Sequence, residues 1–216
     1  RDVTARCAPI RVVAVGLDAP MPSGSSARPT QPYLLFMGRT GKMKPLLRTW
    51  RALTSNAALP PLTVNGRSVP WPEVQLVITG EASADASGLP NVVQRGFVDD
   101  QTRWDLLRGA EALINPSLYE SLSLILLEAW TVGRPVVVNA RCDVTTGLTA
   151  RAQGGLAVDF AAPHAAAGAI AEGLASEQRR VEYGVAGHQF ATSTFVWDRV
   201  LDAYEDAARA TAARTE

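Results

Sequence analysis

Short apolar runs, rich in β-branched residues, alternate along this 216-residue chain with longer segments of helical pattern. We expect strands at residues 11–16, 33–37, 74–79, 92–95, 112–115, 135–139 and 155–158. Strands of this length that alternate with helices predict βαβ units and a parallel sheet. Because crossovers between parallel strands are right-handed, helices should cover both faces of that sheet. The predicted fold class is therefore α/β, with a doubly wound parallel sheet.

Helical patterns and one linker complete the outline of the chain. Helices are predicted at residues 44–55, 100–109 and 122–132, and from Pro163 to the end of the chain with breaks near Gly184 and residues 192–194. Residues 18–31 are rich in Pro, Gly and Ser, which is typical of a linker. We therefore expect residues 1–18 to form an interdomain link with the first strand, and residues 19–216 to form the main domain.

Composition and charge argue against several functions. The chain has 21 basic and 21 acidic residues and a formal net charge of zero, so binding to nucleic acid is not expected. No apolar run is long enough to span a membrane, membrane association is not indicated and no signal-peptide pattern is present, so we expect a cytoplasmic protein. Cys7 and Cys142 lack the spacing of a metal site, and a disulfide between them stays an open alternative.

Residues 115–128 place two carboxylates, Glu120 and Glu128, around the start of a helix. Nearly every side chain from Leu122 to Val132 is apolar, a pattern typical of a buried helix. Glu128 therefore lies where a carboxylate needs a partner, and Glu120 precedes backbone N–H groups that have no partner within the helix. Both acids indicate a ligand site. The alternatives are a helix-dipole role for Glu120 and an internal partner for Glu128.

The carboxyl ends of parallel strands meet at one edge of a sheet, where doubly wound folds bind their ligands. This rule brings together Gly38, Arg39, Gly80, residues 96–97 and residues 116–123. Amides near Ser121 to Ile125, at the helix start, favour an anion such as phosphate. Arg39 and Lys44 could neutralise the same anion, or be ordinary solvated charges.

The order of these groups predicts the kind of ligand. Glu128 lies about two turns into the helix. Acidic residues accept paired hydroxyls well, as they do from a nucleotide ribose. The expected order is a polyol at Glu120, an anion at the helix start and a ribose at Glu128. A nucleotide-diphospho-sugar has this order of groups.

Several short motifs in a fixed order carry a resemblance to a known family. They are Gly38-Arg39 with Lys44, Gly80, Gly96-Phe97-Val98, Pro116-Ser117-Leu-Tyr-Glu120, Glu128-Ala-Trp and Gly133-Arg-Pro-Val-Val137. Together they resemble the C-terminal, donor-binding domain of retaining GT-B glycosyltransferases of family four, the group 1 transferases. The resemblance runs from about Val12 to Trp197 and the final helix. It implies a Rossmann-like sheet that forms the C-terminal half of a GT-B fold.

The resemblance also implies roles for individual residues. Arg39 and Lys44 would neutralise the leaving diphosphate and Glu120 would hold the transferred sugar, so these are the expected catalytic residues. The expected donor-binding residues are Gly38, Gly80, Phe97, Val98, Ser121, Leu122, Ser123, Leu124 and Glu128. Backbone groups of Phe97 and Val98 would recognise the base, and Glu128 would hold the ribose. The family needs no metal at the diphosphate, and no cofactor besides the donor substrate is implied.

The chain departs from the family pattern at two serines. The family usually has glycine at the positions of Ser121 and Ser123. Glycine permits left-handed dihedrals and a close approach of the backbone, whereas serine adds a hydroxyl that could bond phosphate or sugar. No role is assigned to residues 139–143, where many members carry two glycines and an acid.

A GT-B enzyme has a second half, which binds the acceptor in an N-terminal domain. This chain begins near the expected interdomain link, so we expect a fragment that lacks its N-terminal acceptor domain and is inactive alone. The full enzyme would move a sugar from a nucleotide-diphospho-sugar to a hydroxyl acceptor with retention. The alternatives are a GT-B-related phosphorylase or nucleotide-sugar epimerase, and a non-catalytic nucleotide-binding module.

Overall fold

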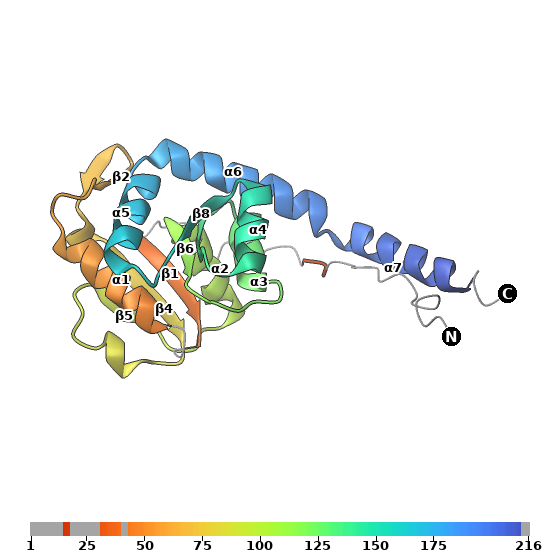
Figure 1. Ribbon diagram of the computed structural model, residues 1–216, viewed down its shortest axis with the longest axis horizontal. Helices are drawn as coiled ribbons and strands as arrows, with labels where there is room; N and C mark the ends of the chain where they lie inside the picture. Colours follow the sequence, from red (N-terminus) through yellow and green to blue (C-terminus); the bar gives the residue numbers. More distant parts are fainter. Residues whose placement is uncertain (1–14, 18–30, 40–42, 213–216) are drawn as a thin grey trace, which may run out of the picture. The chain divides into compact units, whose positions relative to one another are not determined.

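The structure is a computed structural model that describes residues 15–17, 31–39 and 43–212 (Figure 1). The chain divides into two units, one of Ala19–Ala191 and one of Arg1–Asp18 with Thr192–Glu216, and each is described by itself. The predicted linker lies outside the described residues except for Gln31. So does the predicted strand at residues 11–16, except for its end, which is not part of a strand.

A six-stranded sheet forms the centre of the unit Ala19–Ala191. All neighbouring strands in it pair in parallel. In the spatial order β5, β4, β1, β6, β7 and β8, they are Val92–Gln94, Gln75–Gly80, Tyr33–Gly38, Ala112–Asn115, Val136–Asn139 and Gly155–Val158. Each begins and ends within one residue of its predicted position, so the α/β class with a parallel sheet is confirmed.

Helices cover both faces of this sheet. They are α1 (Met43–Ser55), α2 (Asp100–Gly109), α3 (Leu124–Thr131), α4 (Asp143–Ala152) and α5 (Pro163–Leu174). Helix α6 (Glu177–Thr194) packs against Trp130 of α3. Helices α1 and α5 lie side by side (Figure 1) and pack on alternate strand residues such as Leu34 and Phe36. Tyr33 faces the other way, and its hydroxyl donates to the Leu106 carbonyl of α2 at 2.7 Å. Helix α3 packs against α2.

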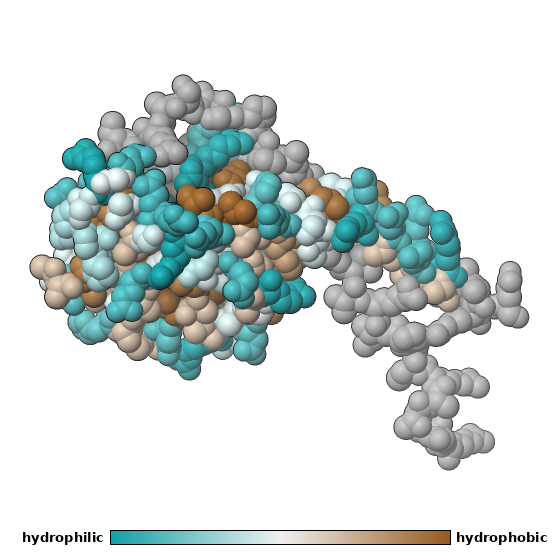
Figure 2. Space-filling model, turned by 90° about the horizontal axis from the view of Figure 1, so that it is seen from above, coloured by the Kyte–Doolittle hydropathy of each residue, from teal (hydrophilic) through white to brown (hydrophobic). Residues whose placement is uncertain are grey.

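Apolar side chains are largely internal to this unit. Trp50, Trp71 and Trp130 are buried. On the face drawn in Figure 2, hydrophobic residues lie in small groups among hydrophilic ones. The other unit contains α7 (Trp197–Ala212), and the helix break before it lies at residues 195–196, just after the predicted residues 192–194, which are still helical. Among the residues that the structure describes, no helix is long and apolar enough to cross a membrane.

Helix α6 continues past Gly184, so the predicted break at that glycine is wrong. A Cβ atom at Gly184 would overlap the carbonyl oxygen of Gly133. The glycine therefore permits a close approach between α6 and the turn after α3. It is required for packing between elements and does not end the helix.

Several short elements carry no clear signal in the sequence and were not predicted. They are the hairpin of β2 (Leu62–Val64) and β3 (Arg67–Val69), the 3-10 helices η3 (Trp71–Glu73) and η4 (Ala84–Ala86), and α4. Strands of three residues are too short to show a period, although Asn65-Gly66 between them is a typical hairpin turn. Helix α4 contains valine, glycine and three threonines, and it is stabilised by packing on β7 and β8.

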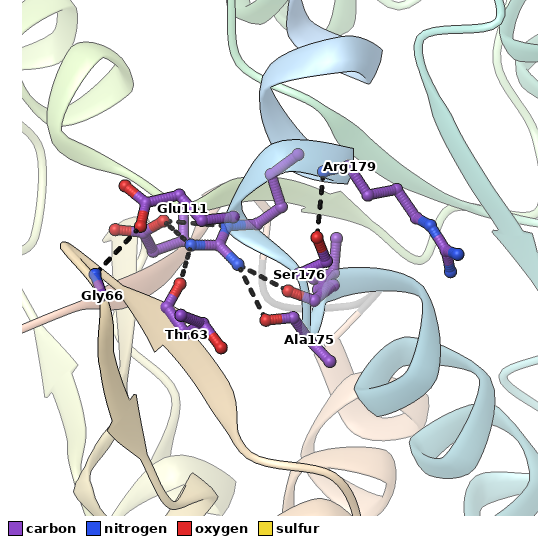
Figure 3. Close-up of polar contacts among 9 residues, drawn as sticks. Thr63, Gly66, Glu111, Ala175, Ser176 and Arg179 are labelled. Atoms are coloured by element: carbon purple, nitrogen blue, oxygen red, sulfur yellow. Dashed lines mark hydrogen bonds and ion pairs between the residues drawn. The ribbon is translucent and has the colours of Figure 1, made fainter.

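A buried arginine of α6, Arg180, connects the hairpin to the sheet. The side chain is 4% exposed and pairs with Glu111, the residue before β6, at 2.8 Å. It also donates to the Thr63 carbonyl of β2 and to the Leu174 carbonyl, each at 2.6 Å. Figure 3 shows this cluster around Thr63, Glu111 and Ala175. The arginine satisfies backbone carbonyls of two segments and the carboxylate of a third, so its loss should affect all three.

Replacing this arginine by leucine (Arg180→Leu) should lower the free energy of unfolding by about 3–5 kcal/mol, because Glu111 and two carbonyl groups lose their donor. The neighbouring Arg179 is exposed, so Arg179→Leu is the matched control, with an expected change below about 0.5 kcal/mol. Chemical denaturation measures the free energy of unfolding of both variants and of the wild type. Equal effects of the two substitutions would contradict the structural role of Arg180.

Candidate functional site

The order of the strands reverses between β1 and β6. Outward from this point, β4 and β5 follow on one side, and β7 and β8 follow on the other. Loops that leave two such strands in opposite directions open a crevice outside the carboxyl ends. Those ends are Gly38, followed by Arg39, and Asn115. Two adjoining cavities lie here and share Gly38, Arg39 and Leu124 in their lining.

The larger cavity has a volume of about 780 Å³. The predicted residues in its lining are Gly38, Arg39, Gly80, Phe97, Val98, Leu124 and Glu128. They come from the ends of β1 and β4, the loop after β5 and the first turns of α3. Leu124 is 49% exposed, so the start of α3 is less buried than its apolar sequence predicts. The structure brings these segments together, while the roles of the residues in binding stay predictions.

The smaller cavity, of about 220 Å³, adds the second acid to the site. Glu120, Asn115 and Ser123 line it beside the shared residues. Arg39 lines both cavities, Glu120 lines only the smaller one and Glu128 lines only the larger one. Arg39 therefore borders the cavities of both acids, while the predicted order of ligand groups stays a prediction.

Three predicted residues line neither cavity: Lys44, Ser121 and Leu122. Lys44, in the first turn of α1, lies 3.6 Å from the carboxylate of Asp85, and both side chains are more than half exposed. An exposed pair of this kind holds its side chains weakly. Ser121 is exposed on the loop before α3. The predicted roles of all three stay untested predictions.

Two buried asparagines hold the loop between β6 and α3. Asn115, the last residue of β6, donates to Ser123 Oγ at 2.9 Å and to Glu120 Oε1 at 3.5 Å. Asn139, the last residue of β7, donates to the carbonyl of Pro116 at 2.9 Å. Because both amides belong to strand ends, they make the loop a defined part of the sheet edge.

Ser123 has the backbone conformation that usually requires glycine. Its φ is 67° and its ψ is 75°, in the left-handed region. The helix therefore begins at Leu124, two residues later than predicted. The residue is 8% exposed, and its Oγ accepts the hydrogen bond from Asn115. Ser121, by contrast, is exposed and has no left-handed backbone.

Gly80 allows the ends of two strands to approach each other. Its φ is 105°, and a Cβ atom at this position would overlap the carbonyl oxygen of Gly38. Its own N–H donates to the Gly96 carbonyl at 2.8 Å. The glycine is thus required by the sheet edge itself, whether or not a ligand also lies against it.

Glu128 has a partner within the protein. Its carboxylate is 19% exposed and lies 2.5 Å from the guanidinium of Arg103 in α2. Burial lowers the pKa of Arg103, but the hydrogen bonds and charges of Glu128 and Asp100 outweigh it, so the pKa lies above its ordinary value. The internal partner considered from the sequence is therefore present, although both side chains also line the larger cavity.

Sequence reasoning missed Arg103. The available signal was its place in the first turn of a helix that follows a strand end. Asp99 fixes that turn, because its side chain accepts a hydrogen bond from the Thr102 amide at 2.7 Å. This backbone hydrogen bond lowers the pKa of Asp99. The cap thus sets where α2 begins, and with it the position of Arg103.

The left-handed backbone at residue 123 favours glycine, whereas the hydrogen bond from Asn115 needs a side-chain acceptor such as serine. Ser123→Gly removes the backbone strain but loses the acceptor, so the free energy of unfolding should change by less than about 1 kcal/mol. Ser123→Ala keeps the strain and loses the acceptor, and should destabilise by about 1–3 kcal/mol. Chemical denaturation measures the free energy of unfolding of the wild type and of both variants. An alanine variant as stable as the wild type would contradict this account of the contact.

Comparison with known proteins places this chain in a family. The model of the family described as "Glycosyl transferases group 1" matches residues 22–190. A D-inositol 3-phosphate glycosyltransferase of Segniliparus rotundus is 31% identical in an alignment 144 residues long, which covers 61% of this chain and 32% of that protein. The chain therefore spans about a third of the length of this relative.

Two solved structures share the fold. One is the C-terminal domain of a glycosyl transferase group 1 family protein (LpcC) from Francisella tularensis, with a TM-score of 0.63, 14% identity, and coverage of 84% of this chain and 100% of that chain. The other is Alr3699/HepE of Anabaena in complex with UDP-glucose, with a TM-score of 0.63, 16% identity, and coverage of 85% and 49%. At these identities the likeness shows the fold alone, which is that of GT-B glycosyltransferases. Because the family model covers most of its length, this chain belongs to the glycosyl transferases group 1 family.

Proposed function

We propose that this chain is the donor-binding domain of a retaining glycosyltransferase that moves a sugar from a nucleotide-diphospho-sugar to a hydroxyl acceptor. The observation that carries the proposal is the arrangement of charges at the reversal of strand order. Arg39 borders both the cavity of Glu120 and the cavity of Glu128, and so does Leu124, the first residue of α3. This arrangement matches a ligand with hydroxyls at both ends and anionic charge between them.

The diphosphate is assigned to the cations and the helix start. Arg39 offers a planar fork and Lys44 a point charge, and both would stabilise the charge that develops as the diphosphate leaves. Lys44 now pairs with Asp85, and an exposed pair can exchange partners at a cost of about 1 kcal/mol or less. The charge of the leaving group would then be neutralised without a metal ion.

The two acids are assigned to hydroxyl groups. Glu120 would accept bonds from the transferred sugar, and Glu128 from the ribose, since ionised carboxylates accept several hydrogen bonds. Backbone groups at Phe97 and Val98 would recognise the base. The UDP-glucose complex of the Anabaena protein supports a nucleotide-sugar donor, as does its shared fold. No protein nucleophile is assigned to either acid.

Transfer itself would need a second domain. The chain spans 32% of its Segniliparus relative, which leaves room for an acceptor domain in a longer protein. We therefore expect the isolated chain to bind a donor without transferring its sugar. Joining it to an N-terminal acceptor domain and measuring turnover with and without an acceptor would distinguish a transferase from an epimerase.

Binding of a nucleotide-sugar should raise the melting temperature of this chain. A ligand at 100 times its Kd stabilises a protein by about 2.7 kcal/mol. Binding of UDP-, GDP- or ADP-sugars can therefore be measured as a rise in the melting temperature. Lys44→Ala should weaken binding about tenfold or more, because a charged contact with phosphate is lost. Arg48→Ala is the matched control, since Arg48 is exposed one turn further along α1.

Two results of these measurements would contradict the proposal, one for donor binding as a whole and one for the role of Lys44. If no nucleotide or nucleotide-sugar shifts the melting temperature, the cavities do not bind a donor in this chain. If a nucleotide binds but Lys44→Ala and Arg48→Ala behave alike, Lys44 does not contact the diphosphate.

A further inference from the structure

Arg103 is held on three sides. Its Nη1 lies against Glu128 Oε2, and its Nη2 lies 3.3 Å from Asp100 Oδ1. Its Cζ lies 5.0 Å from the centre of the Trp104 ring, and Trp104 is 4% exposed. Asp100 is 76% exposed, so its contact is the weaker one, and Glu128 and the buried ring do most to limit the freedom of the guanidinium to turn. Whatever Arg103 holds is therefore held in one position.

The carboxylate that it holds keeps one oxygen available. Within the described part of the chain, the contact of the Glu128 carboxylate runs through Oε2, and Oε1 makes none. Glu128 and Arg103 line the larger cavity together, beside Phe97 and Val98. An ionised carboxylate has about four acceptor positions, so one arginine leaves room for hydroxyl donors.

We propose that Arg103 is a positioning residue for the donor: it orients the Glu128 carboxylate so that this acid accepts the ribose hydroxyls. The inference rests on the proposed function, in which Glu128 binds the ribose. Glu128 extends from the second turn of α3, and 19% of its side chain is exposed. Without a partner, a carboxylate in this place would turn toward water.

The charge of Arg103 is part of this role. An arginine side chain in a protein keeps its charge, and although burial lowers the pKa of Arg103, its contacts with Glu128 and Asp100 raise that pKa above the ordinary value. The charged hydrogen bond from Arg103 fixes the Glu128 carboxylate at Oε2, so that Oε1 remains for hydroxyl donors. The contribution of Arg103 to binding should therefore depend on the ribose hydroxyls of the ligand.

The test compares ligands with and without those hydroxyls. The probes are UDP, GDP or ADP, whichever the wild-type chain binds, and the 2′,3′-dideoxy form of the same nucleotide. Arg103→Gln should weaken binding of the normal nucleotide about tenfold, the equivalent of one charged hydrogen bond, and leave binding of the dideoxy form nearly unchanged. Isothermal titration calorimetry measures both values of Kd.

Arg108→Gln is the matched control. Arg108 is also on α2, pairs with Asp105 at 3.5 Å and is 25% exposed, against 28% for Arg103. It also lies near the Trp104 ring but has no contact with Glu128 among the described residues. We expect wild-type affinity for both ligands. Arg103→Lys serves as a second variant if the glutamine variant fails to fold, because it keeps the charge and loses the planar fork.

A double variant separates positioning from a general effect on stability. Adding Arg103→Gln to Glu128→Gln should weaken binding no further, because Arg103 acts through Glu128. Unchanged or tighter binding by Arg103→Gln would overturn the inference, and so would an equal loss for both ligands. If the wild type binds no nucleotide, the proposed function itself fails. If it binds one but does not distinguish the dideoxy form, the ribose role of Glu128 fails and Arg103 loses its assignment.

Discussion

The reversal of strand order between β1 and β6 is the constraint on which the rest of the site depends. Because all six strands are parallel, their carboxyl ends lie at one edge, and the reversal sends the loops after β1 and β6 in opposite directions. Both cavities occupy the space that these loops leave. Arg39 borders both cavities because it directly follows β1, at the centre of the reversal.

Polar side chains buried near this edge then give the loops their shape. Asn115 and Asn139, at the ends of neighbouring strands, hold the loop that carries Glu120. Arg103 holds Glu128 from a separate helix. Buried polar groups need partners, and here the partners are other site residues. The protein thus organises the acids through its own contacts, which reduces the ordering that a ligand must impose.

Much of the fold was predictable because its signals are local. Each strand of the sheet is an apolar run bounded by polar residues, glycine or proline, and each begins and ends within one residue of the prediction. The failures have a common cause. Gly184 was predicted to break a helix, but it lies within α6, where the absence of a side chain allows close contact with Gly133, which is far away in the sequence. Ser123 takes a left-handed backbone because Asn115 and the sheet edge impose it.

The sequence by itself determined the alternation of strands and helices, and hence which residues follow the strand ends at the functional edge. Only the tertiary structure decided which side chains contact one another there. It pairs Glu128 with Arg103, 25 residues earlier in the chain, and places Lys44 beside Asp85. The physical reason is that strand and helix patterns arise from neighbours along the chain. A pair of charges depends instead on which two elements pack together, and the apolar period of an element does not show which partner it meets.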